Sequence, residues 1–83
     1  GLRRISINEK GMYDLIVVNI LYKPIKQLLL DFCKKLRPNG YLILSGLNEK
    51  QAKDIRNICL QLNFRLVRQL SEDNWMGLLL RKR

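Results

Sequence analysis

The fold of this chain is decided by the stretch Tyr13-Asp14-Leu15-Ile16-Val17-Val18-Asn19-Ile20-Leu21. Its centre, from Leu15 to Val18, is an unbroken apolar run, which is typical of a strand that is buried on both faces of a parallel sheet. Pro24 follows and suits the first turn of a helix, where its missing N–H costs nothing. In open α/β sheets, ligands bind outside the carboxyl ends of such strands, where Asn19 is expected. Asn19 is therefore the first candidate site residue.

Two amphipathic helices are predicted after this strand. The first begins at Pro24 and ends at the turn 37–40, because Pro38 removes a backbone donor and Gly40 tolerates positive φ. The second begins near Asn48 and Gln51, which have the spacing of a capping box. The apolar faces comprise Ile25, Leu28, Leu29, Phe32, Cys33 and Leu36 in the first helix, and Ala52, Ile55, Ile58, Cys59 and Leu62 in the second.

Strands are predicted at 14–21, 41–46, 64–70 and 75–80, and residues 5–7 are a candidate for a further short strand. Strand–helix–strand crossovers are right-handed, so both helices are expected on one face of the sheet. The short turn 71–74 makes the last two strands an antiparallel hairpin. The last strand is apolar and therefore interior, whereas charges mark the third as the edge. The fold class is α/β, with two parallel strands, crossover helices and the strand order first-second-fourth-third.

This arrangement leaves one face of the sheet without helices. Leu15, Val17 and Ile43 lie in strands that are apolar on both sides, and the first strand is too apolar for a comfortable sheet edge. Either missing chain or a second copy of the chain is expected to cover this surface.

Composition limits the class of protein. The 83 residues suffice for one small domain, and 47% hydrophobic with 28% charged residues excludes a disordered chain. No apolar run reaches the roughly 20 residues that a membrane span needs. The chain begins at Gly1 rather than Met, as expected for a piece of a longer protein. The cysteines, Cys33 and Cys59, are predicted to be reduced core thiols of a cytoplasmic protein with no metal site.

The net charge of +9 has two interpretations. The basic clusters Arg3-Arg4, Lys34-Lys35-Arg37 and Arg81-Lys82-Arg83 could serve a phosphate backbone or an acidic partner. They could equally be a solvated polar face and a frayed tail. Because aromatic residues do not interleave with them in one stripe, the sequence signal for nucleic-acid binding is weak.

A family resemblance adds to this picture. The segment Leu36-Arg37-Pro38-Asn39-Gly40-Tyr41-Leu42-Ile43-Leu44-Ser45-Gly46, with Asn19-Ile20-Leu21 before it and the strand from Trp75 after it, resembles the C-terminal half of class I S-adenosylmethionine-dependent methyltransferases. Within them it is most similar to the ribosomal protein L-eleven methyltransferase (PrmA) family, over about residues 12–83. The resemblance implies that residues 1–83 are the C-terminal half of a Rossmann-like methyltransferase domain. The glycine-rich loop of the cofactor-binding half is absent, since the five glycines form no G-x-G cluster.

The resemblance also implies roles for residues. Asn19 would touch the methyl-donor end of S-adenosylmethionine and orient the substrate nitrogen; otherwise, it merely satisfies backbone groups at a strand end. Gly46 after Ser45 either allows close approach of a ligand or enters a loop. Asp14, at the opposite end of its strand, is expected to be structural. Trp75 is expected to anchor the hairpin in the core, with stacking on the substrate as the alternative.

Two functions follow as hypotheses. The first is a fragment of a protein N-methyltransferase that acts on amino groups of a ribosomal protein, with ribosomal RNA nearby, and that is inactive alone. The second is a non-catalytic methyltransferase-like remnant that forms a homodimer through the uncovered face or binds RNA on the ribosome. A truncated piece that self-associates is a third, purely structural possibility.

Overall fold

The computed structural model describes residues 11–19 and 25–83. The chain order is β1 (Tyr13–Asn19), α1 (Ile25–Lys35), β2 (Leu36–Leu47), α2 (Glu49–Gln61), β3 (Phe64–Glu72) and β4 (Trp75–Lys82). The predicted strand at 5–7, the predicted helix start at Pro24 and the last two residues of the predicted first strand lie outside the described residues.

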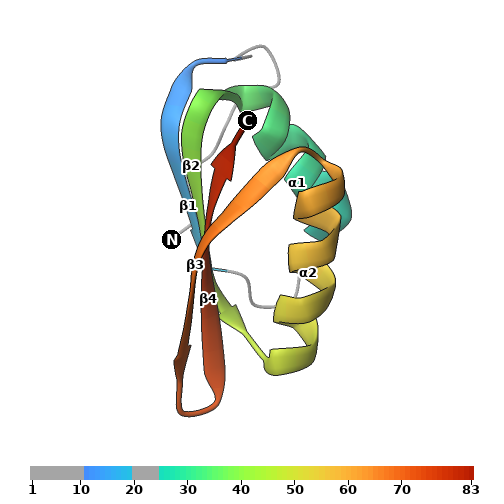
Figure 1. Ribbon diagram of the computed structural model, residues 1–83, viewed down its shortest axis with the longest axis vertical. Helices are drawn as coiled ribbons and strands as arrows, with labels where there is room; N and C mark the ends of the chain where they lie inside the picture. The colour runs from blue at the N-terminus through green and yellow to red at the C-terminus, as the bar shows by residue number, and fades with distance from the viewer. Residues whose placement is uncertain (1–10, 20–24) are drawn as a thin grey trace.

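The four strands form one mixed sheet in the predicted order β1-β2-β4-β3. β1 and β2 are parallel, and β4 is antiparallel to both of its neighbours. Both helices lie on the same face of the sheet, as Figure 1 shows. The α/β fold, its strand order and the placement of the helices are therefore confirmed.

The core lies between the helices and one face of the sheet. Alternate residues of β1, β2 and β4 point towards the helices, because side chains alternate between faces along a strand. The buried strand residues are Ile16, Val18, Leu36, Leu42, Leu44, Leu47, Phe64, Leu78 and Leu80, and the buried helix residues include Leu29, Phe32, Ala52, Ile55 and Cys59. The capping box predicted for α2 is present: the Gln51 N–H donates to the Asn48 side chain at 2.8 Å, and the Asn48 N–H donates to the Gln51 side chain at 2.9 Å.

The segment 37–40 differs from the prediction of a free turn. β2 begins at Leu36, which pairs with Tyr13, and the register then jumps so that Tyr41 pairs with Leu15. The four residues between them form a bulge within the strand. Asn39, not Gly40, has the positive φ of 69°. Gly40 is needed for space, since a Cβ there would lie 2.9 Å from the carbonyl oxygen of Arg37.

The hairpin turn is also shorter than predicted. β3 continues to Glu72, which pairs with Trp75, so that Asp73 and Asn74 alone form the turn. Asp73 has a φ of 48°, a left-handed conformation that Asp tolerates better than most residues. A shift in the β3–β4 register between Leu66 and Arg68 marks a bulge in the edge strand.

The C-terminal basic residues are not a frayed tail. β4 extends to Lys82, and the Lys82 ammonium donates hydrogen bonds to the carbonyl oxygens of Cys33 and, at 2.8 Å, Leu36. These carbonyls lie at the C-terminal end of α1 and just beyond it, where a helix has unsatisfied acceptors and favours positive charge. Lys82 therefore fastens the end of α1 to the last strand.

Candidate functional site

Asn19 lies at the carboxyl end of β1, as predicted. It pairs in register with Ser45 of β2, so these two polar residues meet at the same edge of the sheet. Asn19 is exposed and Ser45 is half-buried. Among residues 11–19 and 25–83, no hydrogen-bond partner is found for the Asn19 side chain.

A bulge in β2 lies directly beside Asn19. Between the pairs Leu44–Leu78 and Leu47–Met76, β2 has two residues, Ser45 and Gly46, where β4 has one. Gly46 has a φ of 78°, a conformation that other residues adopt only with strain. Bulges re-aim side chains and are frequent next to active sites. The backbone at Ser45 and Gly46 therefore departs from regular strand geometry at the edge where a ligand is expected.

On the face of the sheet opposite the helices, the described residues form an apolar surface that no described helix covers. Leu15 is 51% and Val17 is 50% exposed, although their neighbours Ile16 and Val18 on the helix face are buried. The other large apolar residues that contribute to this uncovered face are Tyr41, Ile43, Leu70, Trp75 and Leu79. Strand alternation places Asn19 on this same face as Leu15 and Val17. Whatever covers the uncovered face therefore also reaches Asn19.

Trp75 does not lie in the core, contrary to the prediction. It is 41% exposed and lies at the start of β4, away from the core. Alternation puts Trp75 on the side of Gly77 and Leu79, which is the side without helices. The prediction of a buried anchor was wrong because nothing in the described chain covers that side. A depression of about 330 Å³ next to Trp75 is lined by Glu49, Ser71, Asp73, Asn74, Trp75 and Met76.

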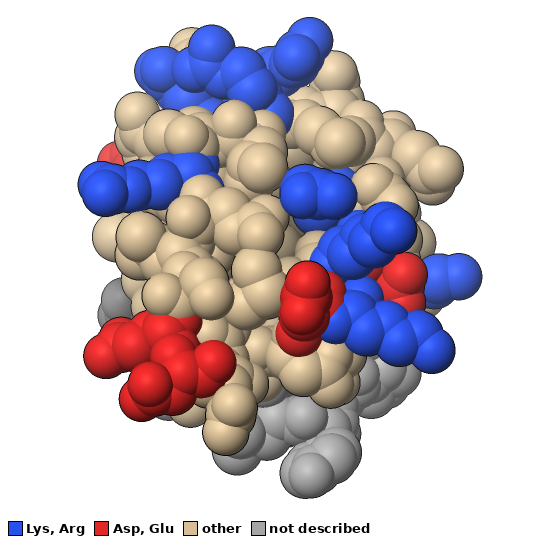
Figure 2. Space-filling view, turned by 60° about the horizontal axis from the view of Figure 1, so that its bottom comes forward, with Lys and Arg blue, Asp and Glu red and all other residues tan. Residues whose placement is uncertain are grey.

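Carboxylates lie at both ends of the sheet, in different surroundings. Glu72 and Asp73 lie at the hairpin, near the carboxyl ends of the parallel strands, and carboxylates gather there in Figure 2. Asp14, at the opposite end of β1, accepts a hydrogen bond from Arg37 at 3.3 Å. This exposed pair ties β1 to the bulge of β2, so Asp14 has the structural role that was predicted.

The two thiols are free, as predicted. Cys59 is fully buried, and this burial, with a smaller contribution from Cys33, raises the pKa of the Cys59 thiol to about 12. Cys33 is half-buried and its Sγ lies 3.6 Å from the carbonyl oxygen of Leu62. In the described part of the chain, no group of three His, Cys, Asp or Glu could hold a metal ion. Neither described helix is long and apolar enough to cross a membrane.

Comparison with known proteins decides the family. The family described as ribosomal protein L11 methyltransferase (PrmA) matches residues 3–83, almost the whole chain. The chain belongs to the PrmA family. A ribosomal protein L11 methyltransferase from Caulobacter sp. (strain K31) is 32% identical over 82 residues, which are 99% of this chain and 28% of that protein. One from Lactobacillus johnsonii is 36% identical over 78 residues, 94% of this chain and 24% of that protein.

Solved structures agree with this membership. The ribosomal protein L11 methylase from Lactobacillus delbrueckii subsp. bulgaricus superposes with a TM-score of 0.75 at 30% identity, over 84% of this chain and 37% of that one. TYW2 from M. jannaschii, solved in complex with AdoMet, shares the fold alone, with a TM-score of 0.52 at 9% identity over 87% of this chain and 38% of that one. The family resemblance and the methyltransferase fold class are confirmed. The chain spans between 15% and 28% of the length of the curated relatives that it matches.

PrmA membership implies S-adenosylmethionine as the methyl donor. The Asn19 amide and the Ser45 hydroxyl offer hydrogen-bonding groups beside an apolar surface. The sequence contains no glycine-rich loop of the kind that the cofactor-binding half of such enzymes carries. The residues present therefore offer hydrogen bonds to part of the cofactor, without a glycine-rich loop to hold the rest.

Proposed function

We propose that this chain is the C-terminal, substrate-side half of an S-adenosylmethionine-dependent protein N-methyltransferase that acts on amino groups of a ribosomal protein. PrmA family membership supports the reaction class. The observation that carries the proposal is the position of Asn19: it lies beside Ser45 at the carboxyl edge and on the uncovered face of the sheet. A cofactor-binding half that covers this face brings the methyl donor to Asn19.

Methyl transfer requires mainly that the protein position the substrate amine and the methyl group in line. S-Adenosylmethionine supplies an electrophilic methyl group on a sulfonium. The Asn19 amide oxygen accepts an N–H hydrogen bond from the neutral substrate amine and aims its lone pair along the line of attack. A carboxylate at this position would instead stabilise the ammonium form, which has no lone pair to donate. An uncharged acceptor therefore suits position 19.

The surroundings support an amine substrate. Glu49 and Asp73 line the depression beside Trp75, at the same end of the sheet as the carboxyl ends of β1 and β2. Carboxylates near a site attract a cationic protein segment over several ångströms and are screened by salt. The reaction would take place in the cytoplasm, where the free thiols Cys33 and Cys59 stay reduced.

A chimera tests the proposal. The chain replaces the matching C-terminal segment of the Lactobacillus delbrueckii enzyme, and transfer of a labelled methyl group to ribosomal protein L11 is measured. We expect activity, and a loss of about 100-fold in kcat for Asn19→Ala, since misplacing a reacting group costs rates of this order. The control Asn57→Ala changes an exposed Asn of α2, away from the carboxyl edge of the sheet, and should retain kcat. A folded chimera that binds S-adenosylmethionine but transfers nothing, or equal rates in both variants, contradicts the proposal.

The chain alone should not bind the cofactor measurably by calorimetry, because it lacks the glycine-rich loop. Clear saturable binding would show that the cofactor contacts are misassigned.

The second candidate function, a non-catalytic module that dimerises, is favoured by the exposed apolar residues Leu15 and Val17. Sedimentation velocity separates the two ideas: a monomer at all concentrations leaves no role for self-association.

A further inference from the structure

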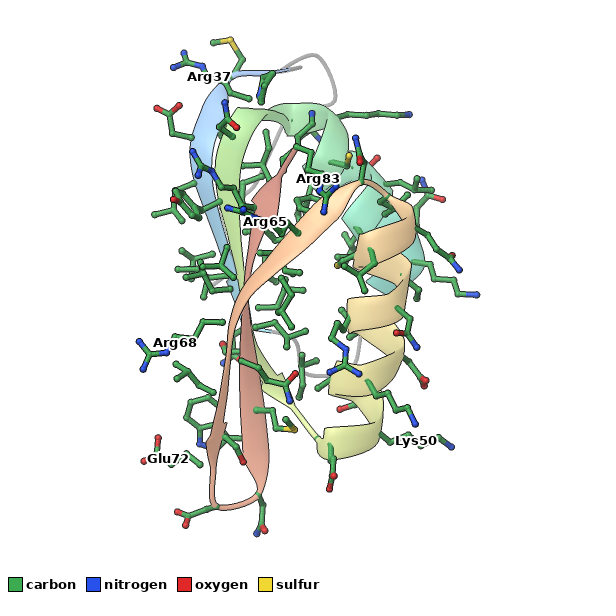
Figure 3. All side chains as sticks on the ribbon, in the orientation of Figure 1. Arg37, Lys50, Arg65, Arg68, Glu72 and Arg83 are labelled. Carbon is green, nitrogen blue, oxygen red and sulfur yellow. The ribbon has the colours of Figure 1, made fainter. Side chains whose placement is uncertain are left out.

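The end of the sheet remote from Asn19 has a cluster of cations that the methyl-transfer proposal does not use. A depression of about 560 Å³ there is lined by Asn39, Arg65, Arg81, Lys82 and Arg83. Because β4 is antiparallel, its C-terminal residues lie at the amino ends of β2 and β3. Figure 3 shows Arg65 and Arg83 close to one another in projection, in the upper part of the view.

Like charges face one another in this cluster. Arg65 of β3 is paired directly with Arg81 of β4. Directly opposed like charges on neighbouring strands are destabilising. Among the described residues that line the depression, there is no Asp or Glu side chain to neutralise them. An anion held between the guanidinium groups would remove this repulsion.

Among the described residues, two of these cationic side chains make contacts that hold them in place, and two make no hydrogen bond or ion pair. The Arg81 guanidinium lies over the Tyr41 ring, 5.3 Å from its centroid, and Arg81 Nε donates to the Asn39 carbonyl oxygen at 3.2 Å. Lys82 is fastened to the end of α1. Arg65 and Arg83 are exposed, and within residues 11–19 and 25–83 their side chains have no hydrogen bond or ion pair.

We propose that Arg65, Arg81 and Arg83 form a binding site for the phosphate backbone of single-stranded RNA, separate from the edge where Asn19 lies. Arginine forks bind phosphate oxygens in a bidentate manner, and Arg81 is already oriented by its two contacts. The described lining residues include no apolar side chain that could anchor a peptide, whereas phosphate contacts require only cations. The net charge of +9 adds long-range attraction for a polyanion.

The test is salt-dependent binding of a labelled 20-nucleotide single-stranded RNA, measured by fluorescence anisotropy between 50 and 200 mM KCl. Three phosphate contacts predict a slope of log K against log salt of about −2. Arg65→Ala/Arg83→Ala should reduce the slope by about 1.4 and weaken binding by about 50-fold at 50 mM KCl. Arg65→Gln/Arg83→Gln repeats the test with longer side chains, and thermal melting confirms that each variant is folded.

The matched control is Lys50→Ala/Lys53→Ala, which removes the same charge from exposed positions of α2. Its slope and affinity should stay within about twofold of the unchanged chain. Equal losses in both double variants would overturn the site, because net charge alone would then explain binding. Absence of RNA binding at 50 mM KCl would also overturn it, as would equal affinity for a polyglutamate 20-mer, which would indicate an acidic protein partner instead.

Discussion

Two valines on the same strand provide a test of the uncovered face. Val17 and Val18 are adjacent in β1, but Val17 is 50% exposed and Val18 is 3% exposed. Replacing each by Ala removes two methyl groups and lowers the strand propensity by the same amount. The difference between the two variants therefore reports only what each side chain contacts.

The expected difference can be worked out from burial. Each buried methyl group contributes about 0.8 kcal/mol, and a residual cavity adds to the loss, so Val18→Ala should cost about 2–3 kcal/mol. Val17 already meets water over half its surface and leaves no enclosed cavity, so Val17→Ala should cost about 0.5–1 kcal/mol.

Urea unfolding followed by circular dichroism measures both values on the chain alone. With a denaturant slope of about 1 kcal/mol/M, the midpoints of the two variants should differ by about 1.5–2 M. Equal midpoints for Val17→Ala and Val18→Ala would show that both faces of β1 are buried, for instance by self-association. A repeat at tenfold lower protein concentration separates that case from an error in the fold.

Three further predictions concern single residues. Gly40→Ala should destabilise the chain by about 1–3 kcal/mol in urea unfolding, because the new Cβ would lie 2.9 Å from a backbone carbonyl oxygen. Gly11→Ala is not a suitable control, since Gly11 has a φ of 61°. Lys82→Met should cost about 1–3 kcal/mol, since it leaves carbonyls at the end of α1 without a donor, whereas Lys50→Met on the surface of α2 should be near neutral. The native state keeps the Cys59 thiol protonated above pH 9.0, whereas the thiol of the unfolded chain loses its proton. The free energy of unfolding should therefore fall as the pH rises from 9.0 towards about 12. In Cys59→Ala, the free energy of unfolding should depend less on pH over this range. An identical alkaline slope in Cys59→Ala would contradict the assignment.

The sequence predicted the strand order because two of its signals are strong. The apolar run around Ile16 and the short connection before Trp75 fix a parallel strand and a hairpin. Right-handed crossover then leaves one placement for the helices. The position of Asn19 at the carboxyl edge beside Ser45 followed from the same pattern.

The errors came from contacts that a linear pattern does not contain. Trp75 was expected in the core because large aromatic residues are usually buried, but its side of the sheet has no cover in the described chain. Lys82 was grouped with a solvated tail, although it reaches the end of α1 across 46 residues of sequence. Arg65 and Arg81 are 16 positions apart, so only strand pairing reveals that they face one another.

Hydroxyl-radical footprinting can determine whether the cofactor-binding half of the methyltransferase lies on the uncovered face. Oxidation of Leu15 and Val17 is compared between the chain alone and the Lactobacillus delbrueckii chimera, with Leu60 of α2, which is 48% exposed, as the internal reference. We predict that Leu15 and Val17 become protected at least fivefold in the chimera while Leu60 is unchanged. Undiminished oxidation of Leu15 and Val17 in a folded, cofactor-binding chimera would show that the cofactor-binding half lies elsewhere.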